Sequence, residues 1–334
     1  MTQLKISIDP GSSATKVSYQ VDGGDVKCFS MTPYCAEVPM DYPDTRRLGM
    51  GMGRPHLESA WVSDPDGCYL LGEGAKKFHG SEVRNNELKY QKALYKVLGI
   101  LSHVQAFEDD SFSIDVGVLL PFDEYVTKES LERELMMAAR DVEYCGRSQS
   151  LEITSLSIRP EGAGLFLSGV PSQVDIKRSR VGVLVIGHRN ASWLVTEHGA
   201  PVLEASVTND LGFRWVVQEV RQRTGHKDEI QLAEMIFGGE NMPRDIESAV
   251  DEVLPLYWMQ IEGFLKEQRP TDYVVCGGGA ALLLKQDIMT HLPGKVGWAH
   301  ELMRGVAKAG IRDKVLACRL SDCYGLLLTL GENA

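Results

Sequence analysis

The chain has 334 residues, with 35 Lys and Arg side chains against 46 Asp and Glu, so its formal net charge is −11. This length is sufficient for two domains with a sizeable core. An acidic chain is a poor direct binder of a phosphate backbone, which argues against direct DNA binding. The densest basic cluster, KRSR at 177–180, is typical of a solvated turn.

The cysteines and the N-terminal sequence favour a cytoplasmic protein. Seven cysteines occur at scattered spacings without a CxxC pair, and the spacing of Cys318 and Cys323 matches no common zinc pattern. We therefore expect reduced thiols. The N-terminal residues lead directly into a strand pattern without an apolar signal region, and no stretch is long enough to span a membrane.

The first residues predict an antiparallel meander. Alternating apolar residues predict strands at 4–9, 15–21 and 26–31, and the Gly23–Gly24 pair predicts the tight turn between the last two. Residues 31–80 are rich in Pro and Gly and are expected to form a small, irregular elaboration, with a short strand that ends at a glycine turn within 68–77.

Helices and buried strands are expected in the rest of the first half. A helix is predicted at 85–104, with leucines on its apolar face, and a second helix at 127–146, with Thr127 as N-cap and Gly146 as the stop. Apolar runs predict a buried strand at 113–121 and another from 151 that breaks at Pro160. The residues assigned to the solvent face of the first helix are Lys89, Lys92 and Lys96, and those assigned as its possible cap are Asn85 and Asn86.

The second half repeats the order of the first. A second meander at 180–207 precedes a helix at 211–225 and a long helical region at 245–268, which Pro255 is expected to kink or divide. Residues 271–284 predict a strand, a glycine turn and a helix. The last element, residues 316–330, has a strand-like start followed by an apolar helix. The two halves indicate a duplication at the level of architecture.

The turn DPGSSATK carries the first candidate site. Its glycine allows the backbone to approach an anion, and its hydroxyls and N–H groups can form a concave anion site. Its lysine supplies a charge suited to phosphate, and Asp9 is suited to hold hydrated Mg²⁺ through water. An ordinary hairpin turn is the alternative interpretation. The candidate anion-binding residues are Gly11, Ser12, Ser13, Thr15 and Lys16.

Two other turns carry candidate residues. Gly277, Gly278 and Gly279 separate an apolar strand from a helix, so a flat ring or a phosphate can approach the backbone there. The spacing is not GxGxxG, so a dinucleotide fold is not expected, and a packing turn is the alternative. Glu161, in RPEGAG, ends a strand and is suited to orient a water molecule or to act as a base, although a Glu beside a Pro at the end of a strand is usually a simple turn residue.

Together, these features resemble the actin, Hsp70 and sugar-kinase ATPase superfamily. Two meanders with glycine turns, a Glu-ended strand and a strand–GGG–helix occur in the order found there, and the compact length resembles the bacterial actin-like ParM/StbA proteins. The resemblance implies an α/β fold with two RNase H-like domains, a nucleotide cleft between them and a small inserted subdomain. The implied parts are domain I at 1–165 with the subdomain at about 31–105, domain II at 166–310, and a C-terminal helix at 311–334 that returns to domain I.

The second turn departs from the family pattern. VLVIGHRNASWLV, residues 183–195, retains Gly187 but has Val185 where the family has an acid that acts on the metal's water shell and on hydrolysis. His188, Arg189 and Asn190 replace the usual small or hydroxyl residues and add donors for phosphate. The resemblance thus implies binding of ATP or GTP with Mg²⁺, with slow or altered hydrolysis.

The implied function is a nucleotide-dependent filament. Proteins of the ParM type polymerise on ATP and act with a small DNA-binding adaptor, ParR-like, to segregate plasmids, while other actin-like members shape cells. A chromosomal cell-shape filament with little turnover and a non-polymerising nucleotide-gated adaptor stay open, whereas a small-molecule kinase is disfavoured because Glu161 is the one clear base. Residues 35–80 are expected either to touch a neighbouring subunit or to tuck their Met and Trp side chains into the subdomain.

Overall fold

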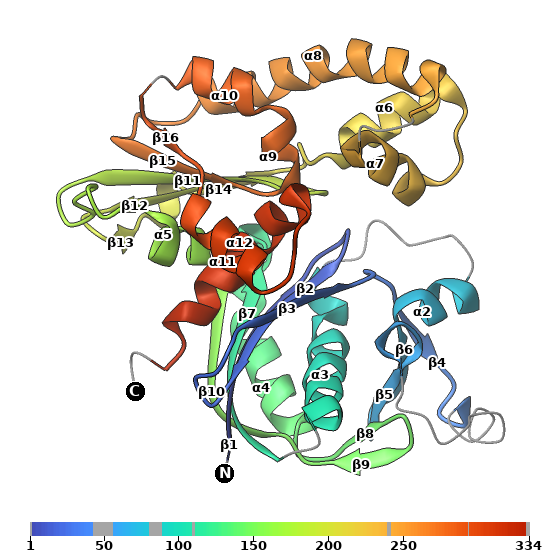
Figure 1. The fold of residues 1–334 in the computed structure, drawn as a ribbon. Helices are drawn as coiled ribbons and strands as arrows, with labels where there is room; N and C mark the ends of the chain where they lie inside the picture. Colours follow the sequence, from blue (N-terminus) through green and yellow to red (C-terminus); the bar gives the residue numbers. More distant parts are fainter. Residues whose placement is uncertain are drawn as a thin grey trace. The chain divides into compact units, whose positions relative to one another are not determined.

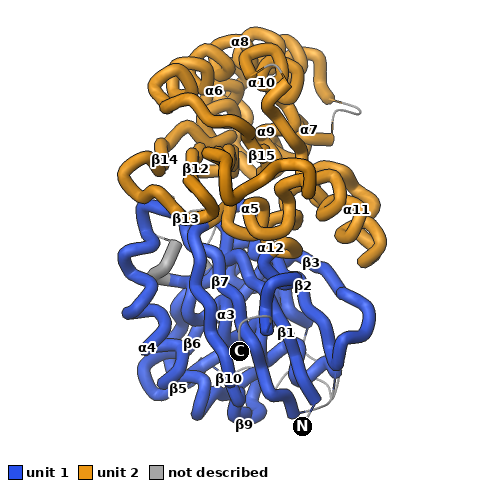
Figure 2. Tube along the Cα trace, turned by 90° about the vertical axis from the view of Figure 1, so that its left-hand side faces the viewer, with its two compact units in different colours: residues 1–160, 326–334 blue, residues 161–325 orange. Residues whose placement is uncertain are grey.

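The chain divides into two compact units, and each is described by itself. The computed structural model describes residues 2–42, 56–79, 89–108, 111–238, 242–292 and 294–331 (Figure 1). Unit 1 comprises residues 1–160 and 326–334, and unit 2 comprises residues 161–325, as coloured in Figure 2. The chain passes from one unit to the other after Pro160 and again within helix α12 (Lys314–Thr329).

Unit 1 is built on a five-stranded sheet in the order β10-β7-β1-β2-β3. β1 pairs antiparallel with β2 and parallel with β7, which in turn pairs parallel with β10. The predicted meander is therefore confirmed, although its turn has positive φ at Asp22 and Gly23 and not at Gly24. The strands are β1 (Thr2–Pro10), β2 (Thr15–Val21), β3 (Lys27–Met31), β7 (Phe112–Leu120) and β10 (Glu152–Pro160).

Helices α3 (Lys89–Glu108) and α4 (Lys128–Ala138) lie side by side on one face of this sheet (Figure 1). The predicted cap residues of α3, Asn85 and Asn86, lie outside the described residues. Thr127 precedes α4, after the 3-10 turn η2 (Phe122–Thr127), but its hydroxyl donates to the Glu124 carbonyl (2.7 Å) and caps nothing.

The prediction that the second helix runs to Gly146 is wrong. The helix ends at Ala138, and the next residues form the hairpin of β8 (Val142–Tyr144) and β9 (Arg147–Gln149). Cys145 and Gly146 both have positive φ, 49° and 81°, as the two central residues of a tight hairpin turn do. The glycine that resembles a helix stop is thus a hairpin glycine.

A second sheet in unit 1 replaces the irregular elaboration that the sequence predicts for residues 31–80, although the strand predicted within 68–77 is present as β6 (Gly67–Leu71). Its order is β4-β6-β5-β8-β9, so it also includes the hairpin at 142–149. Trp61 is 1% exposed, which agrees with the expectation that the Trp is tucked into the subdomain; residues 43–55 of this segment lie outside the described part. The added elements are β4 (Cys35–Val38), η1 (Leu57–Ser59), β5 (Trp61–Asp64), β6 (Gly67–Leu71) and α2 (Gly72–His79).

Unit 2 is built on a sheet in the order β13-β12-β11-β15-β16, with β14 beside β12. β11 pairs antiparallel with β12 and parallel with β15, as β1 pairs with β2 and β7 in unit 1. Residues 201–207 are not the continuous third strand expected, because η3 (Leu203–Ala205) interrupts them. The strands are β11 (Arg180–Ile186), β12 (Ala191–Glu197), β13 (Ala200–Pro201), β14 (Val207–Asn209), β15 (Tyr273–Gly277) and β16 (Val296–Gly297).

Alternate residues of β11 lie on opposite faces of this sheet and have different neighbours. Leu184 and Ile186 belong to a core shared with the helices α6, α7 and α8, while Val183 and Val185 lie near Gly162, just before helix α5. Side chains alternate between the two faces along this strand, so the alternation determines which helix each residue lies near. The helices are α5 (Ala163–Gly169), α6 (Arg214–Thr224), α7 (Glu229–Gly238), α8 (Arg244–Lys266), α9 (Gly279–Leu283), α10 (Lys285–His291) and α11 (His300–Lys308).

Two expectations for the helices of unit 2 are corrected. Helix α8 passes through Pro255 as a single element; this proline lies on the exposed face, where water can satisfy the carbonyl that loses its partner. Helix α12 has no strand-like start, because Asp313 accepts a bond from the Leu316 N–H (2.6 Å) and caps it. Within the described ranges, every helix is too short or too polar to cross a bilayer.

We predict that Gly162→Ala destabilises the protein more than Gly199→Ala. Both glycines have positive φ (96° and 81°), which costs a non-glycine residue about 1–2 kcal/mol. A Cβ at Gly162 would also lie 3.0 Å from Leu194 and 3.1 Å from Val183, whereas a Cβ at Gly199 would meet open space. Overpacking should add about 1–3 kcal/mol at Gly162 alone. Urea unfolding of both variants checks this, and equal losses would contradict it.

Candidate functional site

The first turn joins β1 to β2 and is closed by an ion pair. Asp9 faces Lys16 across the two strands, and its carboxylate contacts the Lys16 ammonium. The two side chains are 5% and 14% exposed. The two residues that the sequence assigns to Mg²⁺ and phosphate thus contact one another. Asp9 can exchange the Lys16 ammonium for a cation, and Lys16 can exchange the Asp9 carboxylate for an anion.

The backbone of this turn requires a glycine. The Gly11 N–H donates to the Asp9 carbonyl (2.8 Å), and a Cβ on Gly11 would lie 2.6 Å from the Ala14 carbonyl oxygen. Ser12 is exposed and Ser13 is half-buried. Thr15 is buried, and its hydroxyl has no hydrogen-bond partner among the described residues. A tight glycine turn flanked by hydroxyl side chains has donors of the kind that bind a small anion such as phosphate.

Lys96, which the sequence assigns to the solvent face of its helix, is in fact 6% exposed and faces this turn. Its ammonium lies 3.5 Å from the Gly11 carbonyl oxygen. The spacing contained the signal, because Lys96 is three residues after Ala93 and four before Ile100, both fully buried. A buried ammonium raises the positive charge at the first turn beyond what Lys16 supplies.

The second turn, Gly187–Asn190, joins β11 to β12 and is anchored to the start of α6. The Gly187 N–H donates to the Asn190 carbonyl (2.9 Å). The carbonyls of Gly187, His188 and Arg189 accept bonds from the N–H groups of Phe213 (3.0 Å), Arg214 (2.7 Å) and Gly212 (3.0 Å). Asn190 is 7% exposed. The turn is therefore rigid, with three successive carbonyls fixed by a neighbouring segment.

Charged side chains of both signs surround the second turn, since the Asn190 amide lies 3.3 Å from the Asp210 carboxylate and two arginines act on His188. Burial, followed by the charges of Arg319 and Arg214, lowers the pKa of His188 to about 4, so its ring is neutral at pH 7. Arg214 lies 3.7 Å from the carboxylate of Glu229. His188 can therefore offer a hydrogen bond to a phosphate oxygen, while the positive charge comes from the neighbouring arginines.

Val185 is the counterpart of Asp9 in the second hairpin. Asp9 faces Lys16 across β1 and β2, and Val185 faces Ser192 across β11 and β12. Val185 is 8% exposed, and its methyl group would lie 3.1 Å from a Cβ on Gly162. An apolar side chain therefore lies beside the turn that carries Glu161, at the place that corresponds to Asp9 in the first hairpin.

The triple-glycine turn lies directly against the strand that leads into the second turn. Gly278 has φ 87°, and a Cβ there would lie 2.3 Å from the Ile186 carbonyl oxygen. A Cβ on Gly277 would lie 2.3 Å from Leu165 of α5, and one on Gly279 would lie 3.1 Å from the aliphatic part of Arg319. The contact of Gly278 with the backbone requires glycine.

The predicted site residues thus fall into two sets, one in each unit. In unit 1, the β1–β2 turn gathers Asp9, Gly11 and Lys16 with Lys96. In unit 2, the triple-glycine turn lies against β11 at its end, and Glu161, half-buried, directly follows β10. Lys96 and Arg319 were not predicted, and for Arg319 the sequence contains no local signal.

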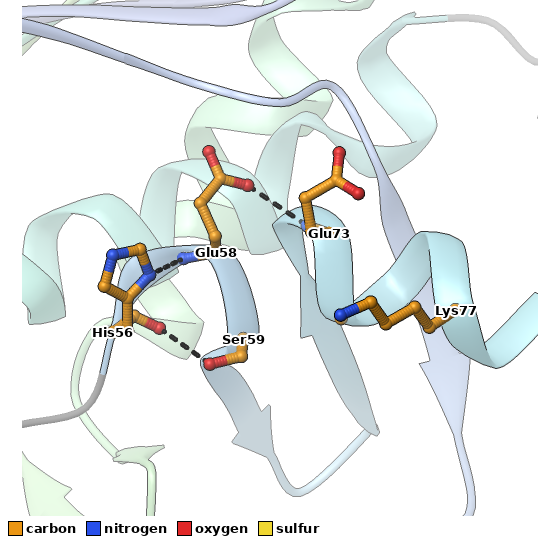
Figure 3. A pocket seen from close by; sticks show the side chains of 6 residues that line it. His56, Glu58, Ser59, Glu73 and Lys77 are labelled. Atoms are coloured by element: carbon orange, nitrogen blue, oxygen red, sulfur yellow. Dashed lines mark hydrogen bonds between the residues drawn. The ribbon is translucent and has the colours of Figure 1, made fainter.

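A pocket of about 410 Å³ elsewhere in unit 1 contains none of these residues (Figure 3). His56, Glu58 and Lys77 are among its lining. The Glu58 carboxylate accepts bonds from the backbone N–H groups of Glu73 (3.1 Å) and Thr32 (2.9 Å), so it ties η1 to the start of α2. We interpret this pocket as a structural junction of the small sheet.

The described ranges contain no cluster of three or more His, Cys, Asp or Glu side chains that could hold a metal directly. Asp9 is the carboxylate at the first turn, and a single carboxylate suits a Mg²⁺ ion that keeps most of its waters. The donor set therefore fits a hydrated ion.

Comparison with solved structures shows the fold. No family model and no curated protein sequence matches this chain. The chain is similar to a 15-stranded ParM filament from Clostridium botulinum (TM-score 0.64, 17% identity, covering 98% of this chain and 99% of that one). It is also similar to an archaeal actin homologue (0.61, 16%, 98% and 99%) and to AlfA from a B. subtilis plasmid in its filament (0.62, 15%, 98% and 100%). The chain has the actin-like fold, as the sequence predicted.

We predict that Lys16→Met lowers the free energy of unfolding by about 2 kcal/mol, because it leaves the Asp9 carboxylate buried without this cation. The double variant Asp9→Asn/Lys16→Met should be more stable than Lys16→Met alone, since the uncompensated charge is gone. Urea unfolding without nucleotide measures both.

Lys27→Met is the matched control for this prediction. Lys27 pairs with Glu108 (2.6 Å) in the same unit, but its side chain is 50% exposed, so its loss should cost less than about 1 kcal/mol. A Lys16→Met variant no less stable than Lys27→Met would show that the pair at the first turn does not stabilise the fold.

Proposed function

We propose that the chain is a nucleotide-dependent, filament-forming actin-like protein of the ParM type. The observation that carries the proposal is the repeated hairpin. In each unit a central strand, β1 or β11, pairs antiparallel with the next strand and parallel with a later one, and a glycine turn follows it. Solved structures of the same fold include filaments of ParM and AlfA.

The proposed ligand is ATP or GTP with Mg²⁺, which supplies the phosphoanhydride bond to be hydrolysed. In the first turn, Lys16 binds phosphate oxygens together with the hydroxyls of Ser12, Ser13 and Thr15, and Asp9 holds the hydrated ion through water. In the second unit, Gly187, His188, Arg189 and Asn190 bind phosphate. Gly277, Gly278 and Gly279 leave room for the base. Glu161 orients the attacking water.

We propose that the units correspond to the two actin-like domains, and that the segment returning at the C-terminus completes the first of them. A leucine of this segment supports the assignment: a Cβ on Gly117 of β7 would lie 2.9 Å from Leu326.

The proposed setting is the bacterial cytoplasm, with copies of the same chain as filament neighbours. A net charge of −11 disfavours direct contact with DNA, so plasmid segregation would need a small ParR-like adaptor. Residues 35–80 are proposed as a polymer contact, of which 35–42 and 56–79 are described.

A second candidate function is a long-lived cytoskeletal filament, or a nucleotide-gated adaptor, with little turnover. Val185 favours it, because an apolar residue replaces the second acid of the site. Phosphate release distinguishes the candidates: segregation requires continuing turnover, whereas a static filament does not.

We predict that the protein sediments on centrifugation with MgATP or MgGTP and stays in solution without nucleotide. Lys16→Met should abolish sedimentation, since the phosphate charge loses its partner at the first turn, while Lys27→Met should sediment as the parent does. Electron microscopy of the pellet identifies filaments. Nucleotide-independent sedimentation, or none under either nucleotide, would contradict the proposal.

We predict that Val185→Asp releases phosphate faster than the parent by about tenfold, because it restores a carboxylate able to order the metal's water. Val185→Asn is the matched control, since asparagine has nearly the same volume and polarity as aspartate but carries no charge. The gain should be absent in Val185→Asn. An aspartate variant no faster than the parent would show that Val185 does not limit hydrolysis.

A further inference from the structure

Asp322, on helix α12, is a buried carboxylate with main-chain partners far away in the sequence. It is 8% exposed. Its Oδ2 accepts a bond from the Gly162 N–H (2.6 Å), and its Oδ1 accepts one from the Leu165 N–H (3.1 Å). Both carboxylate oxygens therefore bind the first turn of helix α5, and all three residues belong to unit 2.

Helix α5 needs this carboxylate because it has no capping side chain of its own. The N-cap residue is Gly162, which supplies no side-chain acceptor. The first N–H groups of a helix lack partners within the helix and must be satisfied from outside. Charge-assisted bonds to a carboxylate are the strong form of such a cap, and α5, with seven residues, has little stability of its own.

The segment that Asp322 fixes is the one that carries Glu161. Gly162 directly follows Glu161, so a bond to the Gly162 N–H fixes the peptide plane that joins the two residues. On its other side, Gly162 lies near Val183 and Val185 of β11 and is held at φ 96°. The backbone beside Glu161 is thus bound by a carboxylate on one side and enclosed by the sheet on the other.

A second contact holds the same two helices together. The Ser168 hydroxyl, at the end of α5, donates to the Gly325 carbonyl of α12 (3.0 Å). A Cβ on Gly325 would lie 2.4 Å from the Gly164 carbonyl oxygen, so the helices approach to backbone contact. This contact preserves the helix pair if Asp322 is replaced, so loss of the carboxylate should loosen the Glu161 turn without unfolding unit 2.

We propose that Asp322 is the positioning residue of Glu161: it fixes the turn from which Glu161 reaches the attacking water. The inference rests on the proposed function. A purely structural cap would affect stability alone, whereas a positioning residue affects the rate of hydrolysis through Glu161 and leaves nucleotide affinity unchanged.

The test measures phosphate release at saturating MgATP and the affinity for a fluorescent ATP analogue, using the full chain. Asp322→Ala should lower the rate about ten- to a hundredfold, as expected when a reacting group is misplaced by about an ångström, with affinity within about twofold of the parent. Asp322→Asn keeps one acceptor oxygen, so its rate of phosphate release should lie between those of the parent and Asp322→Ala. This near-isosteric variant also preserves the test if the alanine variant does not fold.

Asp313→Ala is the matched control. Asp313 lies on the same helix and also accepts a backbone N–H, that of Leu316 (2.6 Å), but it caps α12 itself and contacts no part of the Glu161 turn in the described structure. Its loss should leave the rate of hydrolysis unchanged. An equal fall in rate for Asp313→Ala and Asp322→Ala would overturn the proposal.

Glu161→Gln separates this inference from the function on which it rests. If Asp322 acts through Glu161, Asp322→Ala should have no further effect on the rate in a Glu161→Gln background. A full further loss in that background, or an unchanged rate for Asp322→Ala in the parent, would refute the positioning role alone. A Glu161→Gln variant as fast as the parent, or a parent that releases no phosphate, would refute the role of Glu161 in hydrolysis and the positioning role with it. The filament itself is tested separately by nucleotide-dependent sedimentation.

Discussion

Parallel strand pairing is the constraint on which the candidate site depends. β1 pairs in parallel with β7, and β11 with β15, so within each sheet the turns that follow these strands leave from the same edge. The turns that follow β1 and β11 are the β1–β2 and β11–β12 hairpins, so they lie at the same sheet edges as the turns after β7 and β15. The strand order of each unit, and not the glycine motifs themselves, determines where these turns lie.

The glycines act mainly by allowing one backbone to approach another. Gly278 meets the Ile186 carbonyl, and Gly325 meets the Gly164 carbonyl, both at distances that no Cβ would permit. The first approach couples the triple-glycine turn to the hairpin that binds phosphate in our proposal. The second brings α12 close enough to α5 for Asp322 to cap it. A single substitution at such a glycine would therefore alter two turns at once.

The sequence predicted the parts of the fold that local patterns encode. Alternation identified β1, β2 and β11, and an apolar run followed by Gly277 identified β15, because strand period and glycine turns are properties of neighbouring residues. Cys145–Gly146 was mistaken for a helix end, because a glycine with positive φ serves a helix stop and a hairpin equally.

The site was less predictable where distant residues cooperate. Lys96 was assigned to the solvent face of its helix because it is charged. Its spacing from the buried Ala93 indicated the buried face instead, and that indication was correct. The bonds from Asp322 to Gly162 and Leu165 join residues nearly half the chain apart, and no local pattern reports them. Arg319, whose charge helps to lower the pKa of His188, is also far from it in the sequence, so no local pattern indicates this pair either.

The two turns differ in charge, and this difference bears on turnover more than on binding. In the first turn, Asp9 and Lys16 neutralise one another. A hydrated cation at Asp9 and a phosphate at Lys16 can replace this ion pair together, without leaving either side chain's charge unpaired. At the position of Asp9 the second turn has the apolar Val185, and its His188 is neutral at pH 7. The nearby charges are those of arginines and of Asp210, whose carboxylate lies 3.3 Å from the Asn190 amide. In our proposal this turn binds phosphate without a carboxylate at the position of Val185 to order the metal's water. Under the same proposal, hydrolysis depends on how well the Glu161 turn is held, and therefore on the carboxylate of Asp322.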